Sequence, residues 1–353
     1  MDELCITPIS SFSEFQNNCG KFYDGASTLL NPVRDIRIVD ASTSNTLLIL
    51  RKNVLQREIT QTAIEHYQPI IKKLTSSNRG LAAGHKPPAK HKTYDRSNPV
   101  HSTIAGYIDS PNNKYPCRLS QFSSKHFDIY TKGIPLIESV NALFKETLPL
   151  QYERQLAMAN TSKFRIKETA FSTVTINYNF QTALHVDKGD CEQGFGVLVV
   201  STNQMKGGYL LFPRFDIGIC VSTNDVLFMN VHEYHCNSPI TPISLLPDDA
   251  DSYYRMSFVF YFRTRLLNCR QNEVLKELGV EDGKYWNTSL FISKITDKIG
   301  TAAKQLVFED TKNWVIESER YKFVCKNRQY KLYDKDLKKQ CITLQTIWVY
   351  LNN

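Results

Sequence analysis

The chain has 353 residues, of which 42% are hydrophobic, 22% charged and 11% aromatic. This composition excludes collagen-like, fully disordered and coiled-coil proteins, and the length allows about two domains or one large domain with extensions. The 43 Lys and Arg residues exceed the 35 Asp and Glu residues, which gives a formal net charge of +8. A basic excess of this size is compatible with a polyanionic partner but does not establish one.

The sequence favours a location inside the cell. It contains no run of about 18 uninterrupted apolar residues, and it begins with the acidic MDELC where a secretory signal is basic and then apolar. Its nine cysteines are scattered without a Cys-x-x-Cys pair, which favours reduced thiols and gives no support to a zinc ribbon. We therefore expect a soluble, intracellular protein with no membrane contact.

The first predicted region, residues 1–161, mixes strands and helices. Residues 46–50 form a short strand-like run, and two amphipathic patterns predict helices over 54–74 and 136–148. Pro69 is expected to bend or end the first of these helices. Both helices have one apolar face, so each is expected to cover another layer of structure.

Residues 76–101 separate the two helices and are rich in Gly, Pro and Asn, which predicts a loop. Its lysine, arginine and histidine residues give it a local positive charge. A phosphate-binding loop and an ordinary solvated basic loop explain this stretch equally well.

From Phe171 onward the hydrophobic pattern has a period of two, as in Val174, Ile176 and Tyr178, which predicts a half-buried strand. Further strand-like runs follow at 196–200, 209–212, 217–222, 225–229 and 256–262. Short strands without intervening helices predict an antiparallel sandwich or jelly roll and argue against a doubly wound parallel sheet. We assign residues 162–270 to this core.

The remaining residues, 271–353, are predicted to form a small extension. The patterns at 274–280 and 293–308 are helical, and the last segment interleaves basic and aromatic residues. Such interleaving suits nucleic-acid contact, because cations meet phosphates and rings stack on bases. An ordinary amphipathic strand explains the same pattern, and this simpler interpretation is favoured.

Two side chains in the core carry the main chemical signal. His185 and Asp187 are one residue apart at the end of a predicted strand, so they point to the same side and can converge on one metal ion. A third ligand would come from a distant strand, and both His232 and His235 follow the run at 225–229. Two histidines and one carboxylate form the facial triad that leaves three positions open on Fe(II) for a bidentate co-substrate and dioxygen.

Arg255 opens the apolar strand-like run that ends the core, twenty residues after His235. A guanidinium in such a strand needs an anion, and a dicarboxylate co-substrate with one end on iron offers its second carboxylate. A lone His-x-Asp is a weak motif, but the ordered set with the Gly207-Gly208 turn and Arg255 is more specific.

Five segments carry a resemblance to a known family: SNRGLAAG (77–84), ALHVDKGDCEQGFGVLVV (183–200), GGYLLFP (207–213), DVLFMNVHEYHCN (225–237) and RMSFVFYFR (255–263). They resemble the Fe(II)/2-oxoglutarate dioxygenases of the double-stranded β-helix fold, and within them the Tet/JBP branch. The resemblance implies an α+β fold with a double-stranded β-helix (jelly-roll) core flanked by helices, followed by the small C-terminal extension.

The resemblance also implies roles for individual residues. His185, Asp187 and His235 hold the iron, Arg255 binds the distal carboxylate of 2-oxoglutarate, and Ser257 adds a hydrogen bond. His235 is preferred to His232 because it stands in His-Cys-Asn, where the family has His-Gly-Asn.

Two positions depart from the family pattern. Asn224 replaces a glycine before Asp225, and asparagine enters the left-handed backbone region more readily than other non-glycine residues. Cys236 replaces the glycine after the histidine and is expected to narrow the pocket.

Members of the Tet/JBP branch are known for oxidising the 5-methyl group of thymine or 5-methylcytosine in DNA. The implied function is therefore that of an Fe(II)/2-oxoglutarate-dependent dioxygenase, an oxidoreductase that uses O2 and hydroxylates the 5-methyl group of a pyrimidine in nucleic acid, DNA rather than RNA. It would act in the nucleus or wherever the target DNA lies.

A duplex base must be flipped out or already unpaired to reach the iron, so a basic rim and base-reading side chains are expected. Arg79 and Lys86 are predicted to contact phosphates, and Asn177 or Asp190 to read the base edge. Each also has a structural explanation: Asn177 as a hydrogen bonder within the sheet, Asp190 as a turn residue.

Other functions remain open. The same iron site could hydroxylate a protein side chain or a small molecule, and the fold could serve as a non-catalytic nucleic-acid-binding module. The intact set of His185, Asp187, His235 and Arg255 argues against the second alternative, and a cupin-like metal protein would leave Arg255 without an anion. The sequence leaves open the base, the number of oxidation steps, the oligomeric state and the role of the extension.

Overall fold

A computed structural model of the chain describes residues 1–77, 79–84, 99–109, 117–162, 164–243, 253–268, 299, 305–310, 313–326 and 329–341. The chain forms two compact units. The first contains residues 1–107 and 120–264, and the second contains residues 108–119 and 265–353. The first unit thus includes most of the two regions that the sequence separated at residue 161.

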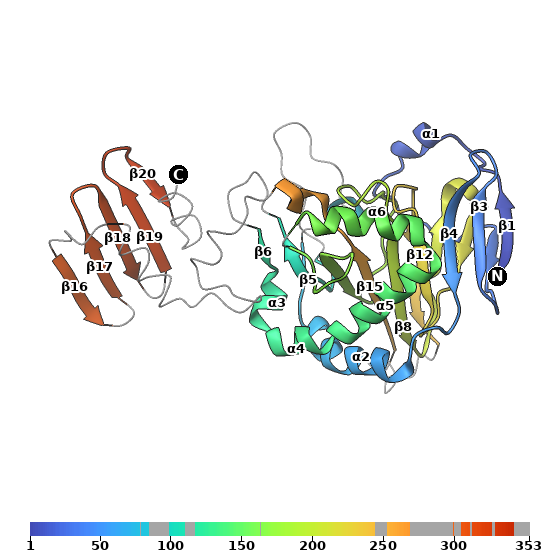
Figure 1. The fold of residues 1–353 in the computed structure, drawn as a ribbon, viewed down its shortest axis with the longest axis horizontal. Coiled ribbons are helices and arrows are strands. Elements are labelled where there is room, and N and C mark those ends of the chain that lie inside the picture. The colour runs from blue at the N-terminus through green and yellow to red at the C-terminus, as the bar shows by residue number, and fades with distance from the viewer. Residues whose placement is uncertain are drawn as a thin grey trace. The chain divides into compact units, whose positions relative to one another are not determined.

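The strands of the first unit are β1 (Asp2–Ile6), β2 (Thr28–Leu30), β3 (Ile36–Asp40), β4 (Asn45–Arg51), β5 (Ser102–Ile108), β7 (Thr173–Tyr178), β8 (Gly196–Asn203), β9 (Met205–Gly207), β10 (Leu210–Phe212), β11 (Ile217–Ile219), β12 (Val226–Met229), β13 (Cys236–Asn237), β14 (Ile240–Pro242) and β15 (Tyr254–Tyr261). Its helices are α1 (Phe12–Gln16), α2 (Arg57–Ile71), η1 (Gly80–Ala83), α3 (Gln121–Lys125), α4 (Phe127–Lys132), α5 (Ile134–Thr147), α6 (Pro149–Asn160) and η3 (Pro213–Phe215). Figure 1 labels many of these elements, and its colours follow the chain from blue at the N-terminus.

Two sheets form the core of the first unit. The large sheet runs in the order β1-β3-β4-β12-β8-β15-β7-β5, and the small sheet in the order β13-β10-β11-β2. All pairings within them are antiparallel except β1 with β3 and β11 with β2. A further pair, β9 with β14, is also antiparallel.

The period-two pattern of β8 explains how the sheets pack. Leu198 and Val200 lie in a buried cluster with Leu210 and Ile219 of the small sheet, so alternate residues of β8 face the space between the sheets. Two antiparallel sheets packed face to face form the jelly roll predicted from the sequence. The α+β double-stranded β-helix fold is therefore confirmed.

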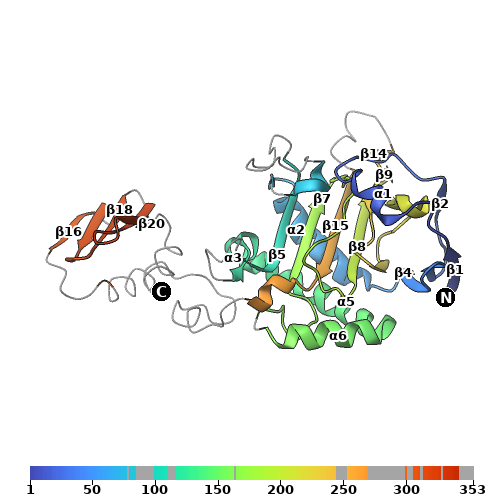
Figure 2. The same cartoon turned by 90° about the horizontal axis from the view of Figure 1, so that it is seen from above.

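Helices cover the opposite face of the large sheet. Val197 and Val199, the other alternate residues of β8, share a buried cluster with Phe144 of α5 and Tyr152 of α6. The Phe144 ring stacks on Phe228 of β12, with ring centroids 5.8 Å apart. Figure 2 shows α5 and α6 lying along one side of the strands.

The elements predicted in this unit are largely present. The strand at 46–50 is β4, and the helices at 54–74 and 136–148 are α2 and α5, both packed on the sheet as expected. Helix α2 runs through Pro69 and ends two residues later. The predicted core runs overlap with β7, β8, β10, β11, β12 and β15. In the predicted loop, residues 80–83 form η1, and residues 85–98 lie outside the described residues.

The second unit contains β6 (Arg118–Leu119), η5 (Thr264–Asn268), β16 (Gln305–Asp310), β17 (Asn313–Glu317), β18 (Tyr321–Lys326), β19 (Gln329–Asp334) and β20 (Lys339–Cys341). Strands β16 to β20 form an antiparallel sheet in sequence order. In β18, Phe323 and Cys325 are buried and alternate with more exposed residues, so an amphipathic strand explains the basic and aromatic interleaving there.

The prediction of a helix up to residue 308 is wrong, because residues 305–308 belong to β16. Leu306, Val307 and Phe308 pair with residues of β17, and such cross-strand pairing overrides a local helical pattern. The predicted helix at 274–280 and nearly all of residues 293–304 lie outside the described residues.

The cysteines depart from the sequence-based expectation at one position. Cys117 is disulfide-bonded, whereas Cys5, Cys19, Cys191, Cys220, Cys236 and Cys341 are free thiols. The expectation of reduced thiols is therefore wrong for Cys117, for which the scattered cysteine spacing gave no signal. Within the described ranges, no helix is both long enough and apolar enough to span a membrane.

The contact between α5 and β12 gives a test of the core. Phe228→Ala should lower the free energy of unfolding by about 3 to 5 kcal/mol, because it removes a fully buried ring stacked on Phe144. Val33→Ala, at a side chain that is 89% exposed, is the control and should change stability by less than about 0.5 kcal/mol. Denaturant unfolding measures both, and equal effects would contradict this packing.

Candidate active site

The two segments that carry the predicted histidines are paired directly. His185 N donates to His235 O at 3.1 Å, and His235 N donates to His185 O at 3.0 Å. Two residues that exchange both main-chain hydrogen bonds stand opposite each other, so their side chains start from neighbouring points. Asp187 is fixed nearby, since its N–H donates to Val231 O at 3.0 Å.

The side chains of His185, Asp187 and His235 converge. Their potential ligand atoms all lie within 4.8 Å of one another. His185 Nε2 lies 3.6 Å from Asp187 Oδ1, and His235 Nε2 lies 3.9 Å from Asp187 Oδ2. These distances place the three groups within reach of one metal ion, and two imidazoles with one carboxylate are the donor set of non-haem Fe(II) oxygenases.

Main-chain carbonyls orient both imidazoles. His185 Nδ1 lies 2.8 Å from Ala183 O, and His235 Nδ1 lies 2.8 Å from Glu233 O. A carbonyl oxygen only accepts, so each Nδ1 carries the proton and donates it. This tautomer leaves each Nε2 free to bind a metal, which is the usual outer support of metal-binding histidines.

Burial keeps His235 neutral. Burial, followed by the charge of the nearby His185, lowers the pKa of His235 to about 4. The imidazole is therefore unprotonated at neutral pH, as a metal ligand must be.

The other histidine considered from the sequence does not join this group. His232 Nε2 lies 3.5 Å from Cys191 O, and its main-chain N–H donates to Asn230 Oδ1 at 3.1 Å. The geometry thus brings His235, and not His232, to His185 and Asp187.

Arg255 lies on β15 and is 4% exposed. Burial lowers the pKa of Arg255 to about 10, so the guanidinium is still charged at neutral pH. Among the described residues, no carboxylate lies within ion-pair distance of it. A buried guanidinium without a protein carboxylate has the chemistry needed to bind an anionic ligand.

The Gly207-Gly208 turn makes room for this guanidinium. A Cβ atom at Gly208 would lie 2.8 Å from Arg255 Cδ and 3.0 Å from Arg255 Nε, and Gly208 has a φ of +66°. Both the close approach and the backbone conformation require glycine.

Ser257 and Asn177 form one hydrogen-bonded unit. Ser257 lies two residues after Arg255 on β15, so both side chains are on the same face of the sheet. Asn177 Nδ2 donates to Ser257 Oγ at 3.2 Å, and Ser102 Oγ donates to Asn177 Oδ1 at 2.5 Å. The structural explanation of Asn177 as a hydrogen bonder within the sheet fits these contacts.

Asp190 is a buried side chain near the cluster of His185, Asp187 and His235. It forms an isolated β-bridge with Arg263. Burial, and then the charge of Asp187, raise the pKa of Asp190 well above its ordinary value, while Arg263 acts in the opposite direction. In the chain, Asp190 lies directly before the turn closed by the hydrogen bond from Gly194 N to Cys191 O.

Arg79 lies deeper than a surface rim. Its Nη2 donates to Thr103 O at 3.1 Å, and its buried Nε has no partner among the described residues. Burial lowers the pKa of Arg79, and Asp187 and Tyr261 partly offset this effect. Lys86, the other predicted phosphate contact, lies outside the described residues.

Tyr261 and Arg263 were not predicted from the sequence as site residues, yet they lie close to Arg79 and Asp190. A usable signal was present, because residues 255, 257, 259, 261 and 263 follow the period of two from Arg255.

The two departures from the family pattern have clear positions. Asn224 has a φ of +68°, the left-handed conformation expected there, and Cys236 packs in a buried cluster with Leu184, Leu211 and Tyr234.

Residues 103–264 match the Tet/JBP family, described as the oxygenase domain of the 2OGFeDO superfamily. This part of the chain is therefore similar to the oxygenase domains of that superfamily. The match is to the Tet/JBP family within it, which confirms the resemblance noted in the sequence. The matched region begins at β5 and includes helices α3 to α6.

Curated relatives and a solved structure show similarity as well. Thymine dioxygenase JBP1 of Trypanosoma brucei brucei is 33% identical over 169 residues, which cover 47% of this chain and 19% of that protein. The bifunctional helicase and thymine dioxygenase JBP2 of Leishmania infantum is 30% identical over 172 residues, which cover 48% of this chain and 15% of that protein. The matches thus span less than a fifth of either relative. NgTET1 in complex with 5mC DNA aligns with a TM-score of 0.48 and 17% identity, covering 81% of this chain and 99% of that chain.

Domains of this superfamily use Fe(II), 2-oxoglutarate and dioxygen. The residues of this chain fit these groups. His185, Asp187 and His235 offer two Nε2 atoms and a carboxylate within reach of one metal ion, and the buried Arg255 carries a positive charge that can pair with a carboxylate of the co-substrate.

The close packing of Gly208 on Arg255 gives a test of the anion site. Gly208→Ala should displace the Arg255 side chain and weaken 2-oxoglutarate binding by about 10-fold, which corresponds to about 1.4 kcal/mol. Gly25→Ala is the control, because an added Cβ there meets no atom within 4 Å. Calorimetric titration of the full chain with 2-oxoglutarate measures both variants. Unchanged affinity in Gly208→Ala would show that Arg255 does not hold the co-substrate.

The reactivity of the Cys236 thiol at pH 8 tests whether the segment beside His235 is buried. Burial raises the pKa of Cys236 to about 12, so the thiol stays protonated and unreactive at pH 8, whereas Cys5 is exposed. Iodoacetamide labelling followed by peptide mass spectrometry should modify Cys5 in the folded protein and Cys236 only after unfolding. Rapid labelling of native Cys236 at pH 8 would contradict the packing of this segment.

Proposed function

We propose that the protein is an Fe(II)/2-oxoglutarate-dependent dioxygenase that hydroxylates the 5-methyl group of thymine or 5-methylcytosine in DNA. The observation that carries the proposal is the convergence of His185, Asp187 and His235 in a domain that also buries Arg255, which has no carboxylate within ion-pair distance among the described residues. The similarity to proteins named thymine dioxygenases supports a methylated pyrimidine as the substrate. The helicase activity in the name of one relative is not part of the proposal, since the match covers only 15% of that protein.

The proposed chemistry divides between the bound groups and the chain. Iron, 2-oxoglutarate and dioxygen together supply the oxidation in which a methyl C–H becomes C–OH and 2-oxoglutarate becomes succinate and carbon dioxide. The chain's own residues bind and orient these groups. His185 and His235 present Nε2, because their Nδ1 protons are held by carbonyls, and Asp187 adds a negative charge that offsets the charge of the metal.

The second carboxylate of 2-oxoglutarate is assigned to Arg255. Its guanidinium is charged and buried, so a paired carboxylate is held more strongly there than at the surface. Ser257 is assigned a hydrogen bond to the same carboxylate, with its hydroxyl oriented by Asn177. In this assignment Asn177 supports the co-substrate site and does not read the base.

The base is assigned to the side of the site where Asp190, Arg79 and Tyr261 lie. Each interacts electrostatically with the metal-ligand group or with one of the others, and Asp190 is buried. Carboxyl and guanidinium groups can hydrogen bond to the edge of a pyrimidine, and a flipped base would reach them. DNA is proposed over RNA because thymine is the base named for the relatives. We place the activity inside the cell, where the target DNA lies.

The decisive experiment incubates the iron-loaded full chain with 2-oxoglutarate, oxygen and oligonucleotides that carry thymine or 5-methylcytosine, both single- and double-stranded. Mass spectrometry of the nucleosides should show a hydroxymethylated base and an equal amount of succinate. Methylated peptides are included in parallel, and hydroxylation of a peptide but of no oligonucleotide would refute the proposed substrate.

Variants connect this activity to the site. His185→Ala and Asp187→Ala should abolish iron-dependent succinate formation. Arg255→Met should raise the required 2-oxoglutarate concentration by about 30-fold or more, the loss expected for a charge-assisted pair of about 2 kcal/mol. Arg37→Met, which removes a partly exposed arginine on β3, is the control and should behave like the unaltered protein. Turnover retained in either ligand variant would eliminate the site.

A further inference from the structure

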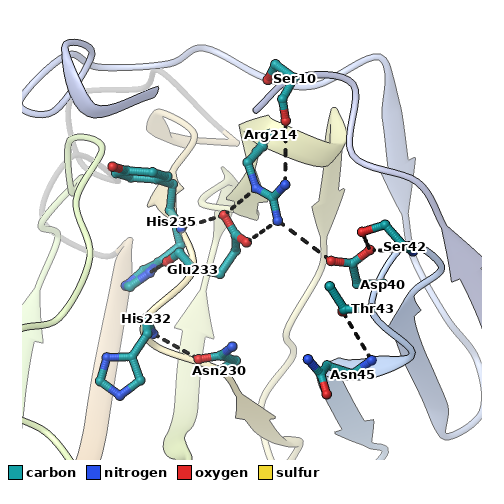
Figure 3. Close-up of polar contacts among 11 residues, drawn as sticks. Ser10, Asp40, Ser42, Thr43, Asn45, Arg214, Asn230, His232, Glu233 and His235 are labelled. Atoms are coloured by element: carbon teal, nitrogen blue, oxygen red, sulfur yellow. Dashed lines mark hydrogen bonds and ion pairs between the residues drawn. The ribbon is translucent and has the colours of Figure 1, made fainter. Parts of the chain in front are cut away.

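A buried ion network lies directly behind the iron-binding histidine His235. Arg214, on η3, donates from Nε to Glu233 Oε1 at 2.9 Å and from Nη2 to Glu233 Oε2 at 2.6 Å. The same Nη2 lies 3.8 Å from Asp40 Oδ2, at the end of β3, and Nη1 donates to Ser10 O at 3.5 Å. Figure 3 shows Arg214 between the two carboxylates and below Ser10.

This network is shielded from water. Glu233 and Asp40 are 6% and 7% exposed, and the Arg214 guanidinium carbon lies 4.5 Å from the centre of the Phe215 ring. The second oxygen of Asp40 accepts hydrogen bonds from Ser42 N and Ser42 Oγ at 2.9 and 2.6 Å. The charges are therefore paired, which buried charges require.

Glu233 links the network to the metal-ligand histidine. Its main-chain oxygen accepts a hydrogen bond from His235 Nδ1 at 2.8 Å, and its carboxylate accepts one from Tyr234 N at 2.9 Å. The two hydrogen bonds from Arg214 fix the Glu233 carboxylate in one orientation. Through its bond to Tyr234 N, the carboxylate then fixes the main-chain segment that contains Glu233 O. A rotation of Glu233 would therefore change the direction of the His235 ring.

Stability alone does not explain such a network. A buried ion pair contributes little net stability compared with well-packed apolar side chains, whereas a bidentate guanidinium imposes a definite geometry. The network also joins segments far apart in the chain, because Ser10 and Asp40 precede the matched oxygenase domain and Arg214 and Glu233 lie within it.

We propose that Arg214 and Glu233 are positioning residues that orient His235 for metal binding, and that Asp40 and Ser10 anchor them. The N-terminal residues that precede the matched domain thus contribute to the metal site, although they supply no ligand. This inference rests on the proposed function in one respect, namely that His235 binds the iron.

The test measures metal binding by residues 1–353 without turnover. Co(II) replaces Fe(II), and its visible absorption reports both the dissociation constant and the ligand geometry. Arg214→Lys keeps the charge but loses the bidentate grip, and it should weaken Co(II) binding by about 10-fold and change the absorption spectrum, the size of effect known for outer-shell substitutions. Arg37→Met, which removes an exposed ion pair with Glu3, is the matched control and should change neither.

A second variant separates positioning from folding. Arg214→Met combined with Glu233→Gln removes both charges while keeping an acceptor for Tyr234 N–H, so no charge of the bidentate pair is left buried alone. Thermal unfolding of the metal-free protein shows whether this variant folds. A folded double variant with weakened Co(II) binding supports the proposal.

The possible failures are distinguishable. Wild-type affinity and spectrum in both variants would overturn the positioning role. A loss of thermal stability with unchanged Co(II) binding would show that the network is only structural, and would overturn it as well. His235→Ala serves as the variant without the proposed ligand and should not bind Co(II). If the unaltered protein also bound no Co(II), the proposed metal site itself would be refuted.

Discussion

The site depends on one reciprocal pair of main-chain hydrogen bonds, those between His185 and His235. These residues are fifty positions apart, yet the pairing puts their side chains side by side with ring centroids 4.4 Å apart. Asp187 then needs only the alternation of an extended chain to reach the same point. Each imidazole is further held by a carbonyl two residues before it in the chain, Ala183 for one and Glu233 for the other. The convergence of the three side chains is thus built chiefly by backbone geometry.

The two faces of β15 differ in role, since one packs against the helices and the other carries the polar residues assigned to binding. On β15, Met256, Phe258 and Phe260 pack under the helices, whereas Arg255 and Ser257 lie on the opposite face. The helical layer buries the large rings, and on the opposite face β15 carries polar groups although the neighbouring β8 packs apolar residues against the small sheet there. A single strand can therefore carry both core residues and the residues assigned to the co-substrate.

The sequence was sufficient for those features that follow a short period or a local motif. The alternation from Val174 predicted β7, and the spacing of His185 and Asp187 predicted a convergence that the structure shows. The partner contacts of Arg214 could not be predicted, because tertiary packing brings Asp40, at the end of β3, and Glu233, between β12 and β13, to it and no spacing relates them. The same reason explains the error at residues 305–308, where pairing with β17 decides the conformation. The ligand roles of the three converging residues stay a prediction.

The N-terminal segment has a consequence for how the domain is delimited. Gly20 N donates to Leu184 O and Leu184 N donates to Lys21 O, both at 2.8 Å, so the stretch just before His185 is hydrogen bonded to residues outside the matched 103–264. Strand β4 likewise covers an edge of β12. A fragment trimmed to the boundaries of the family match would leave these backbone groups without partners and a hydrophobic strand edge open to self-association. The smallest fragment of this chain able to fold alone is therefore larger than the region that matches the family.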